Sequence, residues 1–160
     1  MIEVKVAGVL FNEQATAPVM ILKELNGSRA LPIFIGPAEA TAILYALENI
    51  KLKRPLTIDL LKNLLDAFAI KVQHIIITAL KQETFYAEII MEHNGKIFTI
   101  DARPSDSVGL AVRCGSPIFV AEDVLNQAGI EMTPDDEARL EELRSSIRKI
   151  PPEEFGTYKL

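Results

Sequence analysis

The chain carries one local pattern twice, and this repeat constrains its fold more than any other feature. Residues 20–47 and 88–115 each run through an apolar strand, an Asn-Gly turn, a second strand, a proline and a helix of small residues. Asn-Gly between two apolar runs is a strong signal for a tight β-hairpin turn. The repeat therefore predicts an α+β fold, with mixed or antiparallel sheets built from a duplicated strand–hairpin–helix unit and followed by a C-terminal helix.

Apolar periodicity and turn signals predict the individual elements. Strands are expected over residues 2–11, 17–25, 29–35, 71–82, 83–92, 96–101 and 117–121. Helices are expected over residues 38–50, 54–69, 104–114, 122–129 and 134–149. The last helix has a narrow apolar stripe, made by Leu140, Leu143, Ile147 and Ile150. We expect a domain over residues 1–130, with a C-terminal helix and tail over 131–160 that packs on that domain or on a partner.

The composition fits a folded protein without a membrane segment. Of its 160 residues, 49% are hydrophobic, which is enough for a sizeable core. Charges interrupt the apolar runs well before the roughly 18 residues that a membrane helix needs. The N-terminus has neither the basic start nor the cleavage site of a signal peptide. Cys114 is the single cysteine, so no internal disulfide forms, and we expect it in the core of a cytoplasmic protein.

The charge balance argues against binding to nucleic acid through the overall field of the protein. The chain has 17 Lys and Arg against 22 Asp and Glu, a formal net charge of −5. An acidic protein does not attract a phosphate backbone by its overall field. A function on nucleic acid would therefore need a local basic patch, or metal ions that mask carboxylates.

A charged junction joins the last strand of the second repeat to its helix. Asp101, Arg103, Ser105 and Asp106 surround Pro104 where a strand-like run gives way to a helix-like run. Proline at the first helical position and an acid in the first turn are features of an ordinary helix start. The cation of Arg103, beside the positive end of the helix dipole, is not. Arg103 between Asp101 and Asp106 suggests an ion-pair cluster, which either supports a helix cap or forms a functional site.

The repeat supplies a matching acid, since Glu39 follows Pro37 by two residues as Asp106 follows Pro104. Both carboxylates are therefore expected at equivalent helix starts.

A second Arg-Pro pair, Arg54 and Pro55, is followed by Thr57 and Asp59 at another expected helix start. Two such openings in a small domain raise the prospect that they converge on one place.

None of the common catalytic motifs HExxH, GxSxG, the Walker loop or GxGxxG occurs in the sequence. If the chain catalyses hydrolysis, its residues suit carboxylates that hold Mg²⁺ or Mn²⁺, because these hard cations prefer oxygen ligands. The metal would generate a hydroxide, and an arginine would clamp the phosphate.

Three separate motifs, in the order "LPIFIGPAEATAI", "RPLTIDLL" and "IDARPSDSVGLAVRCGSPIFVAEDVL", resemble the bifunctional nuclease domain family. The resemblance covers about residues 3–130. It implies a compact α+β domain, often dimeric, with DNase and RNase activity in some members. The polar positions that the family shares fall here on Glu39, Arg54, Thr57, Asp59, Asp101, Arg103, Ser105 and Asp106. Ile58 is a departure, because members often carry a histidine at this position, and the site here would depend on carboxylates and arginines alone.

Our first hypothesis is a metal-dependent nuclease that hydrolyses phosphodiester bonds of DNA or RNA. It assigns catalysis to Asp101, Arg103, Asp106 and Arg54, and substrate binding to Arg54, Arg103, Thr57 and Ser105. It assigns a Mg²⁺ or Mn²⁺ ion to Glu39, Asp59, Asp101 and Asp106.

The alternative is a non-catalytic binding or regulatory module, in which the same cluster is a structural ion-pair network. A third, weaker alternative is a small-ligand or nucleotide binder that uses helix N-termini as an anion site. Unpaired strand edges and the stripe of the last helix favour a homodimer.

Overall fold

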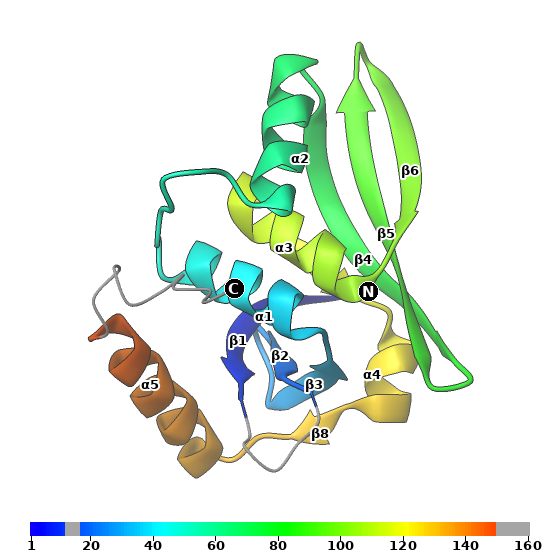
Figure 1. The fold of residues 1–160 in the computed structure, drawn as a ribbon. Helices are drawn as coiled ribbons and strands as arrows, with labels where there is room; N and C mark the ends of the chain where they lie inside the picture. Colours follow the sequence, from blue (N-terminus) through cyan, green and yellow to red (C-terminus); the bar gives the residue numbers. More distant parts are fainter. Residues whose placement is uncertain (12–16, 150–160) are drawn as a thin grey trace.

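The computed structural model describes residues 1–11 and 17–149, which form one mixed sheet of eight strands with helices packed on it (Figure 1). The strands are β1 (Ile2–Leu10), β2 (Val19–Glu24), β3 (Arg29–Phe34), β4 (Lys71–Lys81), β5 (Thr84–His93), β6 (Lys96–Ala102), β7 (Ile118–Val120) and β8 (Ile130–Glu131). They lie in the order β6-β5-β4-β7-β1-β2-β3-β8. The predicted α+β class is confirmed.

The duplication appears as two antiparallel meanders. β1, β2 and β3 form the first, and β4, β5 and β6 form the second. β7 joins them, parallel to β4 and antiparallel to β1. Each meander leads into a helix, α1 (Pro37–Leu47) or α3 (Pro104–Cys114). Each copy thus contains one strand more than the repeated sequence pattern predicts.

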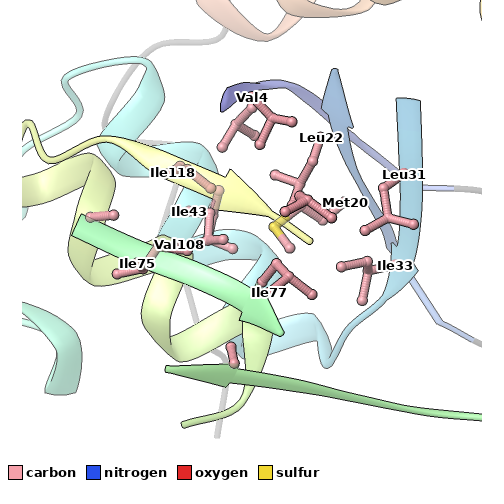
Figure 2. Packing of buried hydrophobic residues seen from close by; sticks show 14 of the residues in the cluster. Val4, Met20, Leu22, Leu31, Ile33, Ile43, Ile75, Ile77, Val108 and Ile118 are labelled. Carbon is pink, nitrogen blue, oxygen red and sulfur yellow. The ribbon is translucent and has the colours of Figure 1, made fainter. Parts of the chain in front are cut away.

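The main core lies between the sheet and these two helices, which pack side by side (Figure 1). Ile43 of α1 and Val108 of α3 are fully buried against strand residues such as Met20, Leu22 and Ile77 (Figure 2). Burial of each such side chain stabilises the fold by roughly 1.5–3 kcal/mol relative to exposure. This packing fixes α1 and α3 relative to each other.

The C-terminal helix α5 (Pro134–Arg148) packs on the body of the protein. Its Leu140 is buried in a second cluster with Ile21, Ala30 and Met132. Because side chains alternate along a strand, Ile21 lies on the face of β2 opposite to the main core. The strand is therefore buried on both faces, which explains its unbroken apolar run.

Ion pairs reinforce the docking of α5. Glu48, just after α1, has a side chain only 3% exposed, and its oxygens accept from Nε of Arg144 at 3.4 Å and of Arg148 at 2.6 Å. Of the predicted stripe, the side chain of Ile147 and the whole of Ile150 lie outside the described residues.

The helix α2 (Thr57–Ala67) begins three residues later than predicted. Leu56 is its extended N-cap, with φ −71° and ψ 168°, and its N–H donates to Oδ2 of Asp59 at 2.8 Å. Arg54 and Pro55 therefore lie in the loop before the helix. The prediction that the second Arg-Pro pair opens a helix is wrong, because the N-cap is Leu56, whose N–H donates to the Asp59 carboxylate.

The other predicted elements begin and end within three residues of their expected bounds, including α4 (Glu122–Ala128). The two-residue strand β8 was not predicted, and it is held by backbone pairing with β3. Among the described residues, no helix is long and apolar enough to cross a membrane.

Two elements leave apolar side chains exposed. α2 has no buried residue in spite of its apolar side, and β6 is an edge strand that is exposed along most of its length. Their exposed large apolar side chains, with that of Phe68 just after α2, are Leu60, Leu61, Leu64, Phe68, Ile97, Phe98 and Ile100.

Candidate functional site

The charged junction at the start of α3 has a structural counterpart at the start of α1. Arg103 and Gly36 are the N-cap residues of the two helices, and both are extended and followed by proline at the first helical position. Asp106 and Glu39 lie in the respective first turns. Because α1 and α3 pack side by side, the duplication brings the two acids to one place.

Arg103 joins these two carboxylates. Its Nε donates to Oδ2 of Asp106 at 2.6 Å, and its Nη2 donates to Oδ1 of Asp106 at 3.0 Å and to Oε1 of Glu39 at 2.9 Å. These bonds use three of the five N–H groups of a guanidinium. The two on Nη1 have no partner among the described residues, and the side chain is 66% exposed.

The cluster keeps Arg103 charged. Its hydrogen bonds to Asp106 and the charge of that carboxylate raise the pKa of the Arg103 guanidinium, and Glu39 adds a smaller contribution in the same direction. The site therefore offers a permanent cation with two unengaged donors.

These three residues line a pocket of about 470 Å³ between α1, α2 and α3. Two further predicted site residues line it, the exposed Thr57 and the buried Ser105. Much of the remaining lining is apolar, and includes Ile43, Leu52, Leu56, Ile58 and Leu61. No imidazole lines this pocket in the part of the chain that the structure describes. A proton acceptor in it would have to be a carboxylate.

Asp59 belongs to a second cluster behind the first. Its Oδ1 accepts from Nε of Arg113 at 2.6 Å, and its Oδ2 accepts from the N–H of Leu56. Nη1 and Nη2 of Arg113 donate to the carbonyl oxygens of Gly109 at 3.1 Å and Ala42 at 3.0 Å. Arg113 is 8% exposed and ties α1, α2 and α3 together.

This engagement is reflected in the pKa of Asp59. Burial raises it, but the hydrogen bonds from Arg113 and from the Leu56 N–H, with the charge of Arg113, outweigh burial and lower the pKa overall. Asp59 is thus a charged carboxylate with a structural role, since both of its oxygens accept hydrogen bonds from the protein.

Two other predicted site residues lie apart from the Arg103 cluster. Arg54 is exposed and lines a neighbouring pocket of about 450 Å³. Asp101 is exposed on β6 opposite Glu88, and it lines neither of the described pockets that Arg103 lines. Within the described residues Arg103 pairs with Glu39 and Asp106, so the suggested ion pair with Asp101 is replaced by one from the repeat copy.

Helix capping explains the position of Asp59 but not the positions of Glu39 and Asp106. The carboxylate of Asp59 accepts the N–H of the α2 N-cap residue. The starts of α1 and α3 have no side-chain cap hydrogen bond among the described residues, since the carboxylates of Glu39 and Asp106 bond to Arg103 instead. Their shared partner is therefore a feature beyond an ordinary helix start.

The four predicted metal ligands do not form one group. The described residues contain no set of three or more His, Cys, Asp or Glu side chains placed to hold a metal ion. Glu39 and Asp106 are close enough to share one guanidinium. Such a pair of carboxylates suits one Mg²⁺ or Mn²⁺ ion that takes its other ligands from water and phosphate. Any such ion would compete with the Arg103 guanidinium.

Sequence reasoning missed Arg113, the residue that connects the three helices. A signal was present, because this is a lone arginine within the apolar helix "SVGLAVRCG", and arginine is rarely buried without a partner. Its partner, Asp59, was identified but was assigned to metal binding.

The fold and the site define a class: an α+β protein with one mixed sheet, whose two equivalent helix starts hold an arginine between two carboxylates. The model of the bifunctional nuclease domain matches residues 20–133, a span that contains α1, α2 and α3. The chain belongs to the bifunctional nuclease domain family. The resemblance seen in the sequence motifs is thereby confirmed.

The match to this chain covers most of one relative but only about a third of two others. An uncharacterised protein of Mycobacterium tuberculosis is 41% identical over 156 residues, covering 98% of this chain and 92% of that protein. Bifunctional nuclease 2 of Oryza sativa subsp. japonica is 30% identical over 122 residues, covering 74% of this chain and 38% of that protein. Bifunctional nuclease 1 of Arabidopsis thaliana is 28% identical over 112 residues, covering 68% and 34%. Nuclease function is supported at the level of the family.

Proposed function

We propose that the protein is a nuclease that hydrolyses phosphodiester bonds of DNA or RNA in the pocket beside Arg103. The observation that carries the proposal is the unengaged Nη1 of an exposed, permanently charged arginine on this pocket. Guanidinium N–H groups are strong donors to phosphate oxygens. The family and the names of its plant relatives support the same chemistry.

The residues divide into roles within this proposal. Arg103 binds the scissile phosphate and stabilises the charge that develops on it. Glu39 and Asp106 hold Arg103 and supply the carboxylate that accepts a proton from the attacking water. Thr57 and Ser105 offer hydroxyl groups to the substrate from the same pocket.

The proposal includes a requirement for Mg²⁺ or Mn²⁺ held by Glu39 and Asp106. When bound, the ion would lower the pKa of a water molecule and polarise the phosphate. Asp59 has no part in this set, because it lines the neighbouring pocket rather than the pocket of Arg103.

A nuclease assay on highly purified protein tests the proposal. We expect cleavage of a labelled oligonucleotide with Mg²⁺ or Mn²⁺, its loss in EDTA, and a loss of about 10²-fold in Asp106→Asn. Asp123→Asn, an exposed acid on α4, is the matched control and should cleave like the wild type. Equal cleavage by the wild type and Asp106→Asn would reveal a contaminating nuclease and contradict the proposal.

The alternative function is a non-catalytic module whose ion pairs only fix helices. The Asp59–Arg113 pair favours it, because that cluster is mostly buried and joins three helices. This alternative predicts no cleavage above background and a lower melting temperature for Asp106→Asn.

We further propose a homodimer formed through the exposed edge strand β6. An edge strand presents unpaired N–H and C=O groups, and antiparallel pairing of β6 with the same strand of a second copy is self-complementary about a two-fold axis. Ile97→Lys should shift the mass measured by light scattering to that of a monomer. Phe34→Lys, on an exposed residue of β3, is the control. A wild-type monomer at micromolar concentration would contradict the proposal.

The cytoplasmic location stays a prediction.

A further inference from the structure

The loop between α1 and α2 concentrates positive charge in an acidic protein. Lys51, Lys53 and Arg54 fall within four consecutive residues, and all three are exposed. None of them forms an ion pair with the described residues, whereas Arg29, Arg103, Arg113, Arg144 and Arg148 all do. The loop therefore presents three uncompensated cations; we call it the basic loop.

The basic loop lines a concave surface. Its three cations line the pocket of about 450 Å³ introduced with Arg54, together with Asn49 and Asn63. Asp59 is the one acid among the lining residues described, and its charge is matched by Arg113. The pocket is therefore locally positive, while the whole chain has a formal net charge of −5.

This positive pocket adjoins the pocket of Arg103. Tyr45, Leu52 and Leu56 line both of them. Arg103 and Ser105 in turn line both the pocket of Arg103 and a further one of about 370 Å³. Three concave regions thus adjoin one another, with Arg103 between two of them and the basic loop at one end.

We propose that the basic loop binds the phosphate backbone of a nucleic-acid strand whose neighbouring phosphodiester lies at Arg103. Exposed, unpaired lysine and arginine side chains bind backbone phosphates without reading the bases, and they release counterions as they do so. The ligand is DNA or RNA, bound through its backbone phosphates and independently of sequence. This inference rests on the proposed nuclease function for its direction, but it makes a separate claim about binding.

The test measures binding rather than cleavage. The full chain is titrated against a fluorescent single-stranded oligonucleotide of mixed sequence in EDTA, at several salt concentrations, and a gel verifies that the oligonucleotide stays intact. For the double variant Lys51→Ala/Lys53→Ala we expect weaker binding, with the slope of log K against log salt reduced by about 0.7 for each lysine removed. Lys5→Ala/Lys96→Ala removes two other exposed lysines and is the charge-matched control.

The outcomes separate this inference from the proposed function. Weaker binding and a reduced salt slope in the loop variant alone support the inference, whether or not the protein cleaves. Equal losses in both double variants show that net charge alone acts and overturn it. Unchanged binding in the loop variant, or no oligonucleotide binding by the wild type at low salt, overturns it even if cleavage is observed. Binding of anionic lipid vesicles in place of the oligonucleotide would also overturn it.

Discussion

Arginines stand at both ends of α3, and the two are held in opposite ways. At the C-terminal end, every side-chain nitrogen of Arg113 donates to the protein and 8% of the side chain is exposed. At the N-terminal end, Arg103 donates to the described part of the chain through two of its nitrogens only, and 66% of its side chain is exposed. The first also lies at the favourable end of the helix dipole and the second at the unfavourable one.

The difference shows how one residue type divides between stability and binding. Arg113 meets two backbone carbonyl groups and one carboxylate, so its bonds hold three helices in place. Within residues 1–11 and 17–149, Arg103 donates only to side chains, and the Nη1 edge of its guanidinium is left without a partner. Four changes test whether this division holds.

The largest effect is expected on stability from Arg113→Ala. This change removes the Arg113 donor from Asp59 and the second hydrogen bond from the helical carbonyl groups of Ala42 and Gly109. Breaking a fully buried pair costs roughly 3–5 kcal/mol, and because the Asp59 side chain is 36% exposed we expect a loss of about 2 kcal/mol. Urea unfolding followed by circular dichroism measures the loss. Arg139→Ala, an exposed arginine on α5, should change stability by no more than about 0.5 kcal/mol. A loss below about 1 kcal/mol for Arg113→Ala would remove the contrast between the two arginines.

Arg103→Ala should act on activity and spare stability. We expect kcat/KM to fall about 10²-fold, as for the loss of one donor to a developing negative charge. Stability should change by less than about 1 kcal/mol, because exposed ion pairs contribute little. Arg103→Lys keeps the charge without the planar fork and should restore only part of the activity. If Arg103→Ala unfolds as readily as Arg113→Ala, both arginines are structural.

Gly36→Ala tests the geometry of the cluster without changing any charged group. A Cβ at Gly36 would overlap with Oε2 of Glu39, so that carboxylate must move away from its position beside Arg103. We expect kcat/KM to fall about 10-fold, because small misplacements of catalytic groups are costly. The matched control is Gly27→Ala, whose Cβ would overlap with Oε2 of Glu24 in the same manner, at residues that do not line the pocket. Equal activities of the two variants would argue against a positioning role for Glu39.

The smallest effect concerns acid stability and Asp59. Its pKa is lowered in the folded state, so its stabilising contribution is complete above the unfolded-state value of about 3.9 and is lost as pH falls through the folded pKa. Unfolding free energies measured from about pH 5 down to about pH 2.5 should therefore fall less steeply for Asp59→Asn than for the wild type. Parallel curves for the two proteins would show that Asp59 is not coupled to folding.

The sequence was sufficient for most of the fold, because hairpin turns, prolines and glycines are local signals. The helix α3 matches its predicted bounds, from the proline at its first position to Gly115, which adopts φ 66°. The start of α2 was missed because it depends on a hydrogen bond from Leu56 to Asp59 rather than on Pro55. Strand β8 was missed because backbone pairing, not an apolar pattern, holds it.

The site was predictable only as a set of residue types. The repeat correctly indicated that Glu39 and Asp106 are equivalent, which is how they come to share Arg103. Which acids face Arg103 depends on the packing of α1 against α3, and local sequence could not separate Asp59 or Asp101 from the cluster. The roles assigned to these residues in catalysis and metal binding stay predictions.

The duplicated corners at Gly36 and Arg103 have one more consequence. An exact duplication would give two equivalent half-sites, each with one carboxylate and one cation paired with it. Here only one copy carries a guanidinium, and the bare glycine in the other gives the Glu39 carboxylate room to lie over its own helix start. A nearly symmetric backbone therefore forms one asymmetric site, to which the copy with Gly36 contributes only the Glu39 carboxylate.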